Sequence, residues 1–125
     1  MNKVAVTGSN GFIGSRLVRL LESKSYKVNK LCRTRSPKDP LSSKYFDLEG
    51  TTNFDYLKNE NVLVHCAYDF SPKSIKDKKR VNIDCTLHLF SEAKRLGVKK
   101  IILISSNASF KSAASDYGKI KYELE

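Results

Sequence analysis

Short apolar runs recur along the chain and predict buried strands. The run at residues 4–6 is apolar without alternation, which is typical of a parallel strand covered on both faces. The intervals between the runs are long enough to hold helices, which favours parallel strands joined by crossovers. Further strands are predicted at residues 28–33, 61–67 and 100–106, with a short one near Tyr45 and Phe46.

Apolar residues at helical spacing fill the intervals between these strands. A helix is predicted from Ser15 onward and a longer one at residues 81–96, where Gly97 marks the stop. A short helix near residues 54–58 and a proline-containing loop at residues 34–44 complete the pattern. The alternation predicts an α/β fold, a doubly wound parallel sheet of about five strands, for which right-handed crossovers give the order 3-2-1-4-5.

Composition favours one domain in a reducing compartment. With 125 residues, 40% of them hydrophobic, the chain suits one globular domain with a core. Three scattered cysteines favour neither disulfides nor zinc, so the cytoplasm is the expected location. No targeting segment is visible, and the longest apolar run, residues 101–104, is far too short to span a bilayer. His65 and His88 lie apart in apolar surroundings, so we expect packed imidazoles and no metal site.

The glycine-rich segment after the first strand, residues 7–14, predicts a dinucleotide site. Its three glycines allow a sharp turn, close approach of a pyrophosphate and tight packing of the next helix on the strand. The N-terminus of that helix then presents unpaired N–H groups to the phosphates. An ordinary glycine-rich turn is the alternative. The residues predicted to bind the dinucleotide here are Gly8, Asn10, Gly11, Phe12, Ile13 and Gly14.

The end of the second strand predicts which dinucleotide binds. NAD-binding proteins of this architecture carry an acidic residue about 20 positions after the glycines, which bonds the ribose 2′-hydroxyl and repels a 2′-phosphate. Cys32 occupies that place, and Arg33 and Arg35 follow. Because arginine offers planar donors suited to phosphate, we expect NADP in preference to NAD, with Arg33 as the first choice and Arg35 as the second. The alternative is that both arginines are solvated loop cations.

Two residues near the C-terminal end have the chemistry of an acid–base pair. Tyr117 and Lys121 are four apart, which places a phenol and an ammonium on one helical face. A nearby positive charge favours a phenolate, so this pair suits proton transfer nearer neutral pH. Such pairs also occur by chance on surface helices, so this one gains meaning only from its context.

Five motifs stand in a fixed order along the chain. They are the glycine segment, Asp47-Leu48, the strand from Val62 to Ala67, Asn82 in Val-Asn-Ile-Asp-Cys-Thr, and Ile104-Ser-Ser106 before Tyr117-x-x-x-Lys121. This order resembles the extended short-chain dehydrogenase/reductase family of the NAD-dependent epimerase/dehydratase type. The resemblance implies a Rossmann-like sheet. It also implies an NAD(P)-dependent epimerase or reductase that exchanges a hydride with a nucleotide sugar, or with a similar hydroxyl or carbonyl compound.

The resemblance assigns cofactor contacts beyond the glycine segment. It implies that Asp47 binds the adenine amino group and that Leu48 lines the adenine pocket. It implies that the Ala67 backbone passes beside the cofactor ribose, and that Asn82 anchors its helix near the site.

The resemblance also assigns the catalytic roles. Ser106 is implied to bind the reacting oxygen of the substrate, and Tyr117 to move its proton. Lys121 is implied to bind the nicotinamide ribose and to favour the tyrosine phenolate. Asn107 and Ala108 stand where family dehydratases carry an Asp-Glu pair, so dehydration is disfavoured.

The substrate side departs from the family pattern. Phe110 and Lys111 replace the usual tyrosine and glycine, and only ten residues separate Ser106 from Tyr117, so the bordering loop is short. Family members continue past the position of Glu125 into further strands and a substrate-binding region. We therefore expect residues 1–125 to be a dinucleotide-binding domain truncated before that region, with negligible turnover alone and a tendency to self-associate.

The charge of the chain suggests a rival function. The formal net charge is +10, and a basic run follows two aromatic residues, Tyr68 and Phe70. No recognised nucleic-acid motif accompanies the run, and charge alone gives only non-specific attraction, so a solvated loop and helix start is favoured over nucleic-acid binding. A non-catalytic dinucleotide-binding or sensor domain is the third reading. The basic run comprises Lys73, Lys76, Lys78, Lys79 and Arg80.

Overall fold

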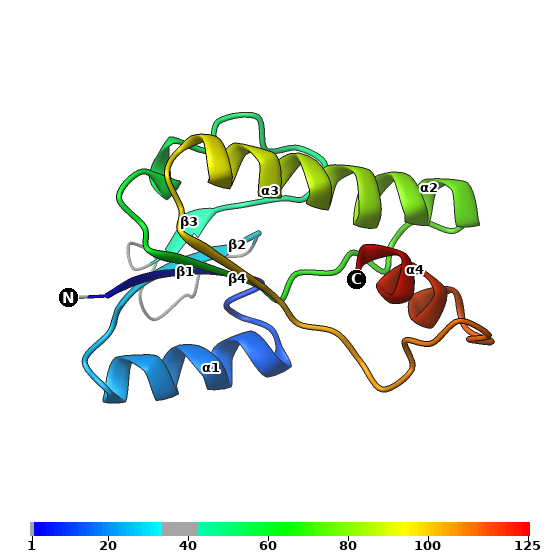
Figure 1. Ribbon diagram of the computed structural model, residues 1–125, viewed down its shortest axis with the longest axis horizontal. Coiled ribbons are helices and arrows are strands. Elements are labelled where there is room, and N and C mark those ends of the chain that lie inside the picture. The colour runs from blue at the N-terminus through cyan, green and yellow to red at the C-terminus, as the bar shows by residue number, and fades with distance from the viewer. Residues whose placement is uncertain (1, 34–42) are drawn as a thin grey trace.

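A parallel sheet forms the centre of the molecule (Figure 1). The computed structural model describes residues 2–33 and 43–125, and the described residues form five strands in the order β3-β2-β1-β4-β5. Every neighbouring pair is parallel, so the predicted fold class, strand number and strand order are confirmed. The strands are β1 (Lys3–Thr7), β2 (Lys27–Cys32), β3 (Ser43–Tyr45), β4 (Val62–His65) and β5 (Lys100–Leu103).

Helices cover both faces of the sheet. Helix α1 (Phe12–Ser23) lies on one face, and on the opposite face α2 (Ile75–Lys79), η2 (Arg80–Asp84) and α3 (Cys85–Arg95) form one continuous helical run (Figure 1). The η2 segment is a π-helix, a local widening that occurs often at functional sites. A 3-10 turn, η1 (Asp55–Leu57), precedes β4, and α4 (Asp116–Leu124) lies beyond the carboxyl end of the sheet.

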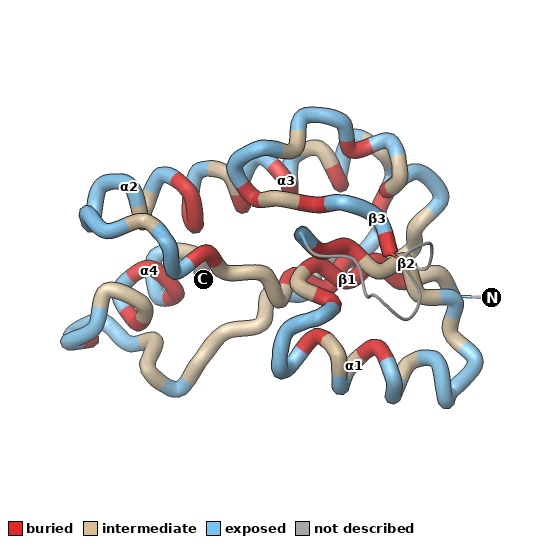
Figure 2. Tube along the Cα trace, turned by 180° about the vertical axis from the view of Figure 1, so that it is seen from behind, coloured by how far each residue is buried: buried red, intermediate tan, exposed pale blue. Residues whose placement is uncertain are grey.

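Alternating side chains of β1 divide the core into two layers. Val4 and Val6 pack with Val18 of α1, whereas Ala5 faces the other way. On that second face Leu89 of α3 joins a larger cluster with the central strands. Figure 2 shows the buried residues concentrated along the strands and the inner sides of α1 and α3. Because β1 is covered on both faces, its unbroken apolar sequence has a direct physical cause.

The strands end earlier than predicted on the functional side. Strand β4 stops at His65 and β5 at Leu103, whereas the sequence predicted strands to residues 67 and 106. One more backbone bond follows each, from Cys66 N–H to the Thr7 carbonyl at 3.3 Å and from Ile104 N–H to the His65 carbonyl at 3.1 Å. Beyond these bonds the chain leaves the sheet. The residues predicted as strand ends instead form the loops around the candidate site.

Two helices begin before their predicted starts. Helix α1 starts at Phe12, not Ser15, because Gly11 already serves as its N-cap. The long helical run starts at Ile75, not residue 81, where the Ser74 hydroxyl accepts a bond from the Asp77 amide at 3.1 Å. The predicted stop is confirmed, since Gly97 has a left-handed φ of +91. Within the predicted loop at residues 34–44, residues 34–42 lie outside the described part, and the last two belong to β3.

Candidate dinucleotide-binding site

A cavity of about 470 Å³ opens at the carboxyl ends of β1, β2 and β4. In open α/β sheets, ligands bind at such a place, where the strand order reverses direction. Most of the predicted site residues line it. Those residues are Gly8, Asn10, Gly11, Phe12, Ile13, Gly14, Arg33, Asp47, Leu48, Ala67 and Tyr117, joined by Cys32, Phe46, Cys66, Tyr68, Asp69 and Phe70.

The glycine turn is built around two close backbone approaches. Gly8 has a left-handed φ of +64, and a Cβ there would lie 2.9 Å from the Ala67 nitrogen. A Cβ on Gly14 would lie 2.0 Å from the Gly8 carbonyl oxygen, which no rearrangement of a flexible side chain relieves. The turn therefore holds β1, α1 and the end of β4 in close contact. This is the packing role predicted for the glycines.

The N-terminus of α1 faces the cavity without a competing acidic group. Its N-cap is Gly11, with an extended backbone, and its first turn contains no acidic residue. The first N–H groups of a helix lack partners within the helix, and the helix dipole favours an anion there. The turn and the helix start therefore fit the pyrophosphate of a dinucleotide.

The end of β2 brings a cation into the same cavity. Arg33 follows the last residue of β2, and its side chain is 57% exposed. Its Nη1 lies 3.7 Å from Oδ2 of Asp69, which belongs to the loop after β4. Arg35, the second predicted phosphate contact, lies outside the described residues.

Hydrogen bonds hold both the side chain and the backbone of Asp69. Its Oδ1 accepts bonds from the Ser71 amide at 2.9 Å and the Ser71 hydroxyl at 2.7 Å. Its backbone N–H donates to Oδ1 of Asn82 at 2.8 Å, and its carbonyl accepts from Nδ2 of Asn82 at 2.9 Å. Burial raises the pKa of the Asp69 carboxyl, but the Ser71 bonds and the Arg33 guanidinium outweigh it, so the pKa lies below its ordinary value. Asn82, in the π-helical segment, therefore anchors this loop as well as its own helix.

The predicted adenine contacts, Asp47 and Leu48, also line the cavity. Asp47 and Leu48 follow β3, and Leu48 is buried. The Asp47 amide donates to the Thr51 hydroxyl at 2.8 Å, and the Thr51 amide donates back to the Asp47 carbonyl at 3.0 Å. This turn fixes the backbone at both predicted contacts.

Of the three predicted catalytic residues, Tyr117 alone is among the residues that line this cavity. Its ring stacks on Phe70, with centroids 5.7 Å apart, and meets the Tyr68 ring edge-on at 4.8 Å. Lys121 is buried beneath, and its Nζ donates to the Ile104 carbonyl at 2.8 Å and lies 5.7 Å from the centre of the Tyr117 ring. Burial lowers the pKa of Lys121. The Ser106 hydroxyl accepts a local bond from an amide two residues on, at 3.1 Å.

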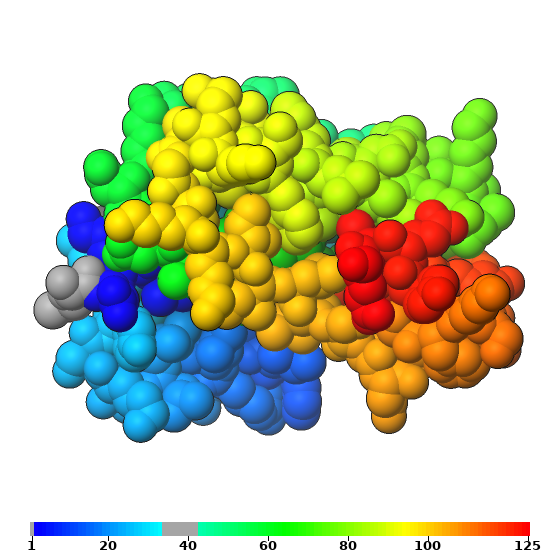
Figure 3. Space-filling view, in the orientation of Figure 1, coloured from blue at the N-terminus to red at the C-terminus, as the bar shows by residue number. Residues whose placement is uncertain are grey.

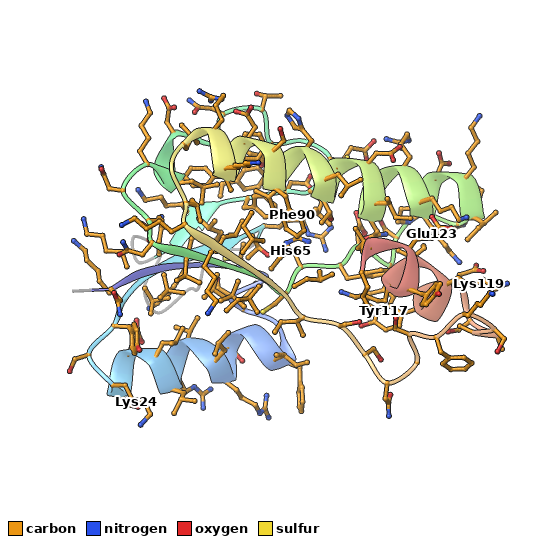
Figure 4. The ribbon with its side chains drawn as sticks, viewed as in Figure 1. Lys24, His65, Phe90, Tyr117, Lys119 and Glu123 are labelled. Carbon is orange, nitrogen blue, oxygen red and sulfur yellow. The ribbon has the colours of Figure 1, made fainter. Side chains whose placement is uncertain are left out.

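A buried polar chain supports the floor of the site. The Thr7 hydroxyl accepts bonds from the amides of Cys66 at 3.1 Å and Ala67 at 3.2 Å. It lies 2.7 Å from Nδ1 of His65, whose Nε2 lies 3.1 Å from the Thr86 hydroxyl. With both Thr7 acceptor positions used, its O–H donates to Nδ1, so Nε2 carries the proton that bonds Thr86. Figure 4 shows His65 between the sheet and α3, next to Phe90.

His65 is therefore a packed imidazole, as predicted. The same prediction was wrong for His88, which is exposed and contacts the Phe54 ring. Burial, followed by the positive charge of Lys121, lowers the pKa of His65 to about 3. The neutral ring ties β1, β4 and α3 together directly below the backbone that the glycine turn approaches.

The basic run is largely paired with acidic groups. Lys78 Nζ lies 2.9 Å from Asp116, and Lys79 Nζ lies 2.7 Å from Glu123, both on α4. Arg80 Nη1 lies 2.7 Å from a glutamate in the loop after β3. Figure 3 shows α4, in red, packed beside the yellow-green α2 segment. The Lys78 and Lys79 pairs link α2 to the helix that carries Tyr117, so this part of the run contributes to packing within the molecule.

Neither metal ligation nor a membrane span emerges from the described ranges. Across residues 2–33 and 43–125, histidine, cysteine and acidic side chains form no group of three that could hold a metal ion. In the same ranges every helix is too short or too polar to cross a membrane.

Comparison with known proteins identifies the family. A family model described as the NAD dependent epimerase/dehydratase family matches residues 4–122. The chain belongs to this family. UDP-glucose 4-epimerase of Vibrio cholerae is 37% identical in an alignment of 112 positions, gaps included, that covers 82% of this chain and 34% of that protein. Ceramide reductase of Caulobacter vibrioides (strain NA1000 / CB15N) is 32% identical in an alignment of 128 positions, gaps included, that covers 94% of this chain and 39% of that protein.

Solved structures agree with the fold. MoeE5 in complex with UDP-glucose and NAD superposes with a TM-score of 0.82 at 27% identity, covering 98% of this chain and 46% of that one. The chain thus spans 34% and 39% of the length of the two curated relatives and under half of this structure. The relatives in this family include epimerases, dehydrogenases and reductases.

Apart from Ala67, sequence reasoning missed the residues that the loop after β4 contributes to the cavity. Tyr68 and Phe70 were noted only for their closeness to the basic run, and Asp69 was not singled out. A signal was available, because all three follow directly on a parallel strand, and the carboxyl ends of such strands converge at one edge of the sheet.

Proposed function

We propose that this chain is the dinucleotide-binding and proton-transfer part of an oxidoreductase or epimerase. Its substrate would be a nucleotide sugar or a similar hydroxyl or carbonyl compound. The observation that carries the proposal is that Tyr117 shares one cavity with the glycine turn and the start of α1. Family membership and the similarity to a UDP-glucose 4-epimerase support it. Because the chain spans about a third of that relative, the activity and substrate of the whole protein are part of the proposal.

Tyr117, Lys121 and Ser106 have different roles in the proposed reaction. A bound nicotinamide dinucleotide supplies the hydride acceptor or donor. Tyr117 takes or returns the proton of the substrate hydroxyl. The Lys121 ammonium stabilises the negative charge of the Tyr117 phenolate. It also holds the cofactor ribose, for which it has donors besides the one bonded to the Ile104 carbonyl. Ser106 binds the reacting oxygen, for which its hydroxyl has a free donor, since it accepts its local bond.

We further propose that the cofactor is NADP in preference to NAD. Support comes from Cys32, which stands where NAD sites have an acidic residue, and from Arg33, which lines the cavity beside it. Arg35, just beyond the described residues, is the second proposed contact. The family is described as NAD dependent and MoeE5 forms a complex with NAD, which favours the other cofactor, so the two cofactors must be compared directly.

The test is calorimetric titration of NAD and NADP into wild type and Arg33→Ala at one fixed salt concentration. We expect tighter NADP binding by wild type, and a loss of about tenfold or more in the variant, because a charge-assisted hydrogen bond contributes about 1.5–3 kcal/mol. Equal or tighter NAD binding by wild type would refute the cofactor assignment. Binding of neither dinucleotide would refute the function itself.

Hydride exchange is tested on the bound cofactor. Nucleotide sugars are added to the loaded protein, and nicotinamide absorbance is followed for a single turnover. A change in absorbance that Tyr117→Phe abolishes supports the enzyme. Dinucleotide binding with no change for any nucleotide sugar favours a non-catalytic binding or sensor domain.

A further inference from the structure

The proposed 2′-phosphate contact already has a partner inside the cavity. Arg33 Nη1 lies 3.7 Å from Asp69 Oδ2, and both residues line the same space as the glycine turn. Strands β2 and β4 flank β1, so their carboxyl ends face each other across that turn. A cation from one end therefore meets a carboxylate from the other at the position expected for the adenosine ribose.

The two partners differ in how firmly they are held. The Asp69 side chain is 11% exposed, its Oδ1 accepts two bonds from Ser71, and its backbone is clamped by Asn82. The Arg33 side chain is 57% exposed, and it contacts the firmly held Asp69 carboxylate through the ion pair. Any change of partner must therefore come from movement of Arg33, while the carboxylate stays in place.

We propose that Asp69 is a positioning residue that sets the cofactor preference, because it holds Arg33 and competes with a 2′-phosphate for the guanidinium. This inference rests on the proposed function, since it concerns the same dinucleotide site. A phosphate monoester carries about −1.5 to −2 charges at neutral pH, so it draws Arg33 more strongly than one carboxylate does. NADP binding must nevertheless displace or share the ion pair, whereas NAD binding leaves it intact. Asp69 thus weakens a preference that Arg33 creates.

Asp69→Asn removes the charge and keeps an oxygen that accepts the Ser71 bonds. In this variant Arg33 has no carboxylate partner at this position, and a 2′-phosphate gains it without competition. We expect the ratio of the NAD to the NADP dissociation constant to rise about fivefold, because the competing pair involves an exposed guanidinium and such pairs are worth about 1 kcal/mol at most. NAD affinity should change little, because the ribose hydroxyl does not need the cation.

The experiment is a double-mutant cycle read out as that ratio. NAD and NADP are titrated calorimetrically into wild type, Asp69→Asn, Arg33→Ala and the double variant at one salt concentration. Because Asp69 acts through Arg33, its substitution should change the ratio by less than about twofold in the Arg33→Ala background. Asp55→Asn, which removes an exposed carboxylate paired with Lys58, is the matched control and should leave the ratio unchanged.

An unchanged ratio in Asp69→Asn would overturn the inference, and so would an equal rise in both backgrounds, which would mean direct repulsion of the phosphate. If Asp69→Asn does not fold, Asp69→Ser removes the same charge, offers a hydroxyl oxygen to the Ser71 amide and carries the same expectations. Failure of this inference differs from failure of the proposed function. If only the inference fails, wild type binds a dinucleotide but Asp69→Asn leaves the ratio of dissociation constants unchanged. If the proposed function fails, wild type binds neither dinucleotide.

Discussion

Acid should destabilise this domain through one histidine. His65 is 1% exposed, its Nδ1 accepts a bond from Thr7, and burial with the Lys121 charge lowers its pKa from 6.5 to about 3. The unfolded chain therefore binds a proton that the folded protein excludes. The resulting stability is fully present above pH 6.5 and is lost as pH falls toward 3.

The magnitude follows from the two pKa values. Each pKa unit corresponds to about 1.4 kcal/mol, so the full difference between 6.5 and about 3 is worth about 5 kcal/mol. Between pH 6 and pH 4 the loss is about 2.5 kcal/mol by the same linkage. Domains of this size have unfolding free energies of about 5–15 kcal/mol, so the effect is a large share of the total.

The assay is urea unfolding of wild type, His65→Gln and His88→Gln between pH 7 and pH 4. Glutamine cannot titrate, so we expect His65→Gln to lose about 2.5 kcal/mol less than wild type between pH 6 and pH 4. His88 is exposed, with its ring against the edge of Phe54, and His88→Gln is the matched control that should follow wild type. Parallel pH profiles for wild type and His65→Gln would refute the buried neutral imidazole and the bonds assigned to it.

Three further predictions concern packing. Gly14→Ala places a Cβ 2.0 Å from the Gly8 carbonyl oxygen, so we expect a loss of about 3 kcal/mol in urea unfolding, and less than about 1 kcal/mol would show that the turn is looser than described. Lys79→Glu breaks the pair with Glu123 and should speed amide exchange in α4, with protection restored by the charge-swapped Lys79→Glu/Glu123→Lys variant. The sequence predicts self-association, and Ile102 is 38% exposed on β5, at the edge of the sheet, so Ile102→Lys should lower self-association measured by sedimentation; unchanged self-association would contradict an interface at β5.

Much of the fold was predictable because its determinants are local. Unbroken apolar runs identify strands covered on both faces, and the handedness of crossovers then leaves one natural strand order. The start of α2 was not predictable in this way. Its residues show no apolar face, and its lysines find partners on α4, far away in the sequence. The early ends of β4 and β5 were likewise not predictable, because they are set by the points at which the chain leaves the sheet to form the loops around the site.

The residues of the candidate site likewise fall into those that the sequence predicted and those that depend on tertiary contacts. The glycine turn and Arg33 were found from local signals at the ends of two strands, whereas Tyr117 was found only through the order of motifs along the chain. All of them line the cavity. The position of Asp69 after β4 signalled its place at the cavity, but its contact with Arg33 was not predictable, because that contact arises only when β2 and β4 flank β1. Long-range pairs of this kind leave no periodicity or spacing to find.

Dinucleotide binding by the glycine turn is the central claim, and Gly11→Val tests it most directly. Gly11 has an extended backbone that valine adopts without strain. Its Cβ would lie 3.3 Å from the Gly8 carbonyl oxygen, a tight contact that a shift of a few tenths of an ångström relieves, so the fold should survive. The added side chain would stand at the helix start where the pyrophosphate must approach. Ser23→Val, at the far end of the same helix, is the control. We predict that wild type and Ser23→Val bind dinucleotide with equal affinity in calorimetric titration and that folded Gly11→Val binds at least about tenfold more weakly. Unchanged affinity in folded Gly11→Val would contradict the account.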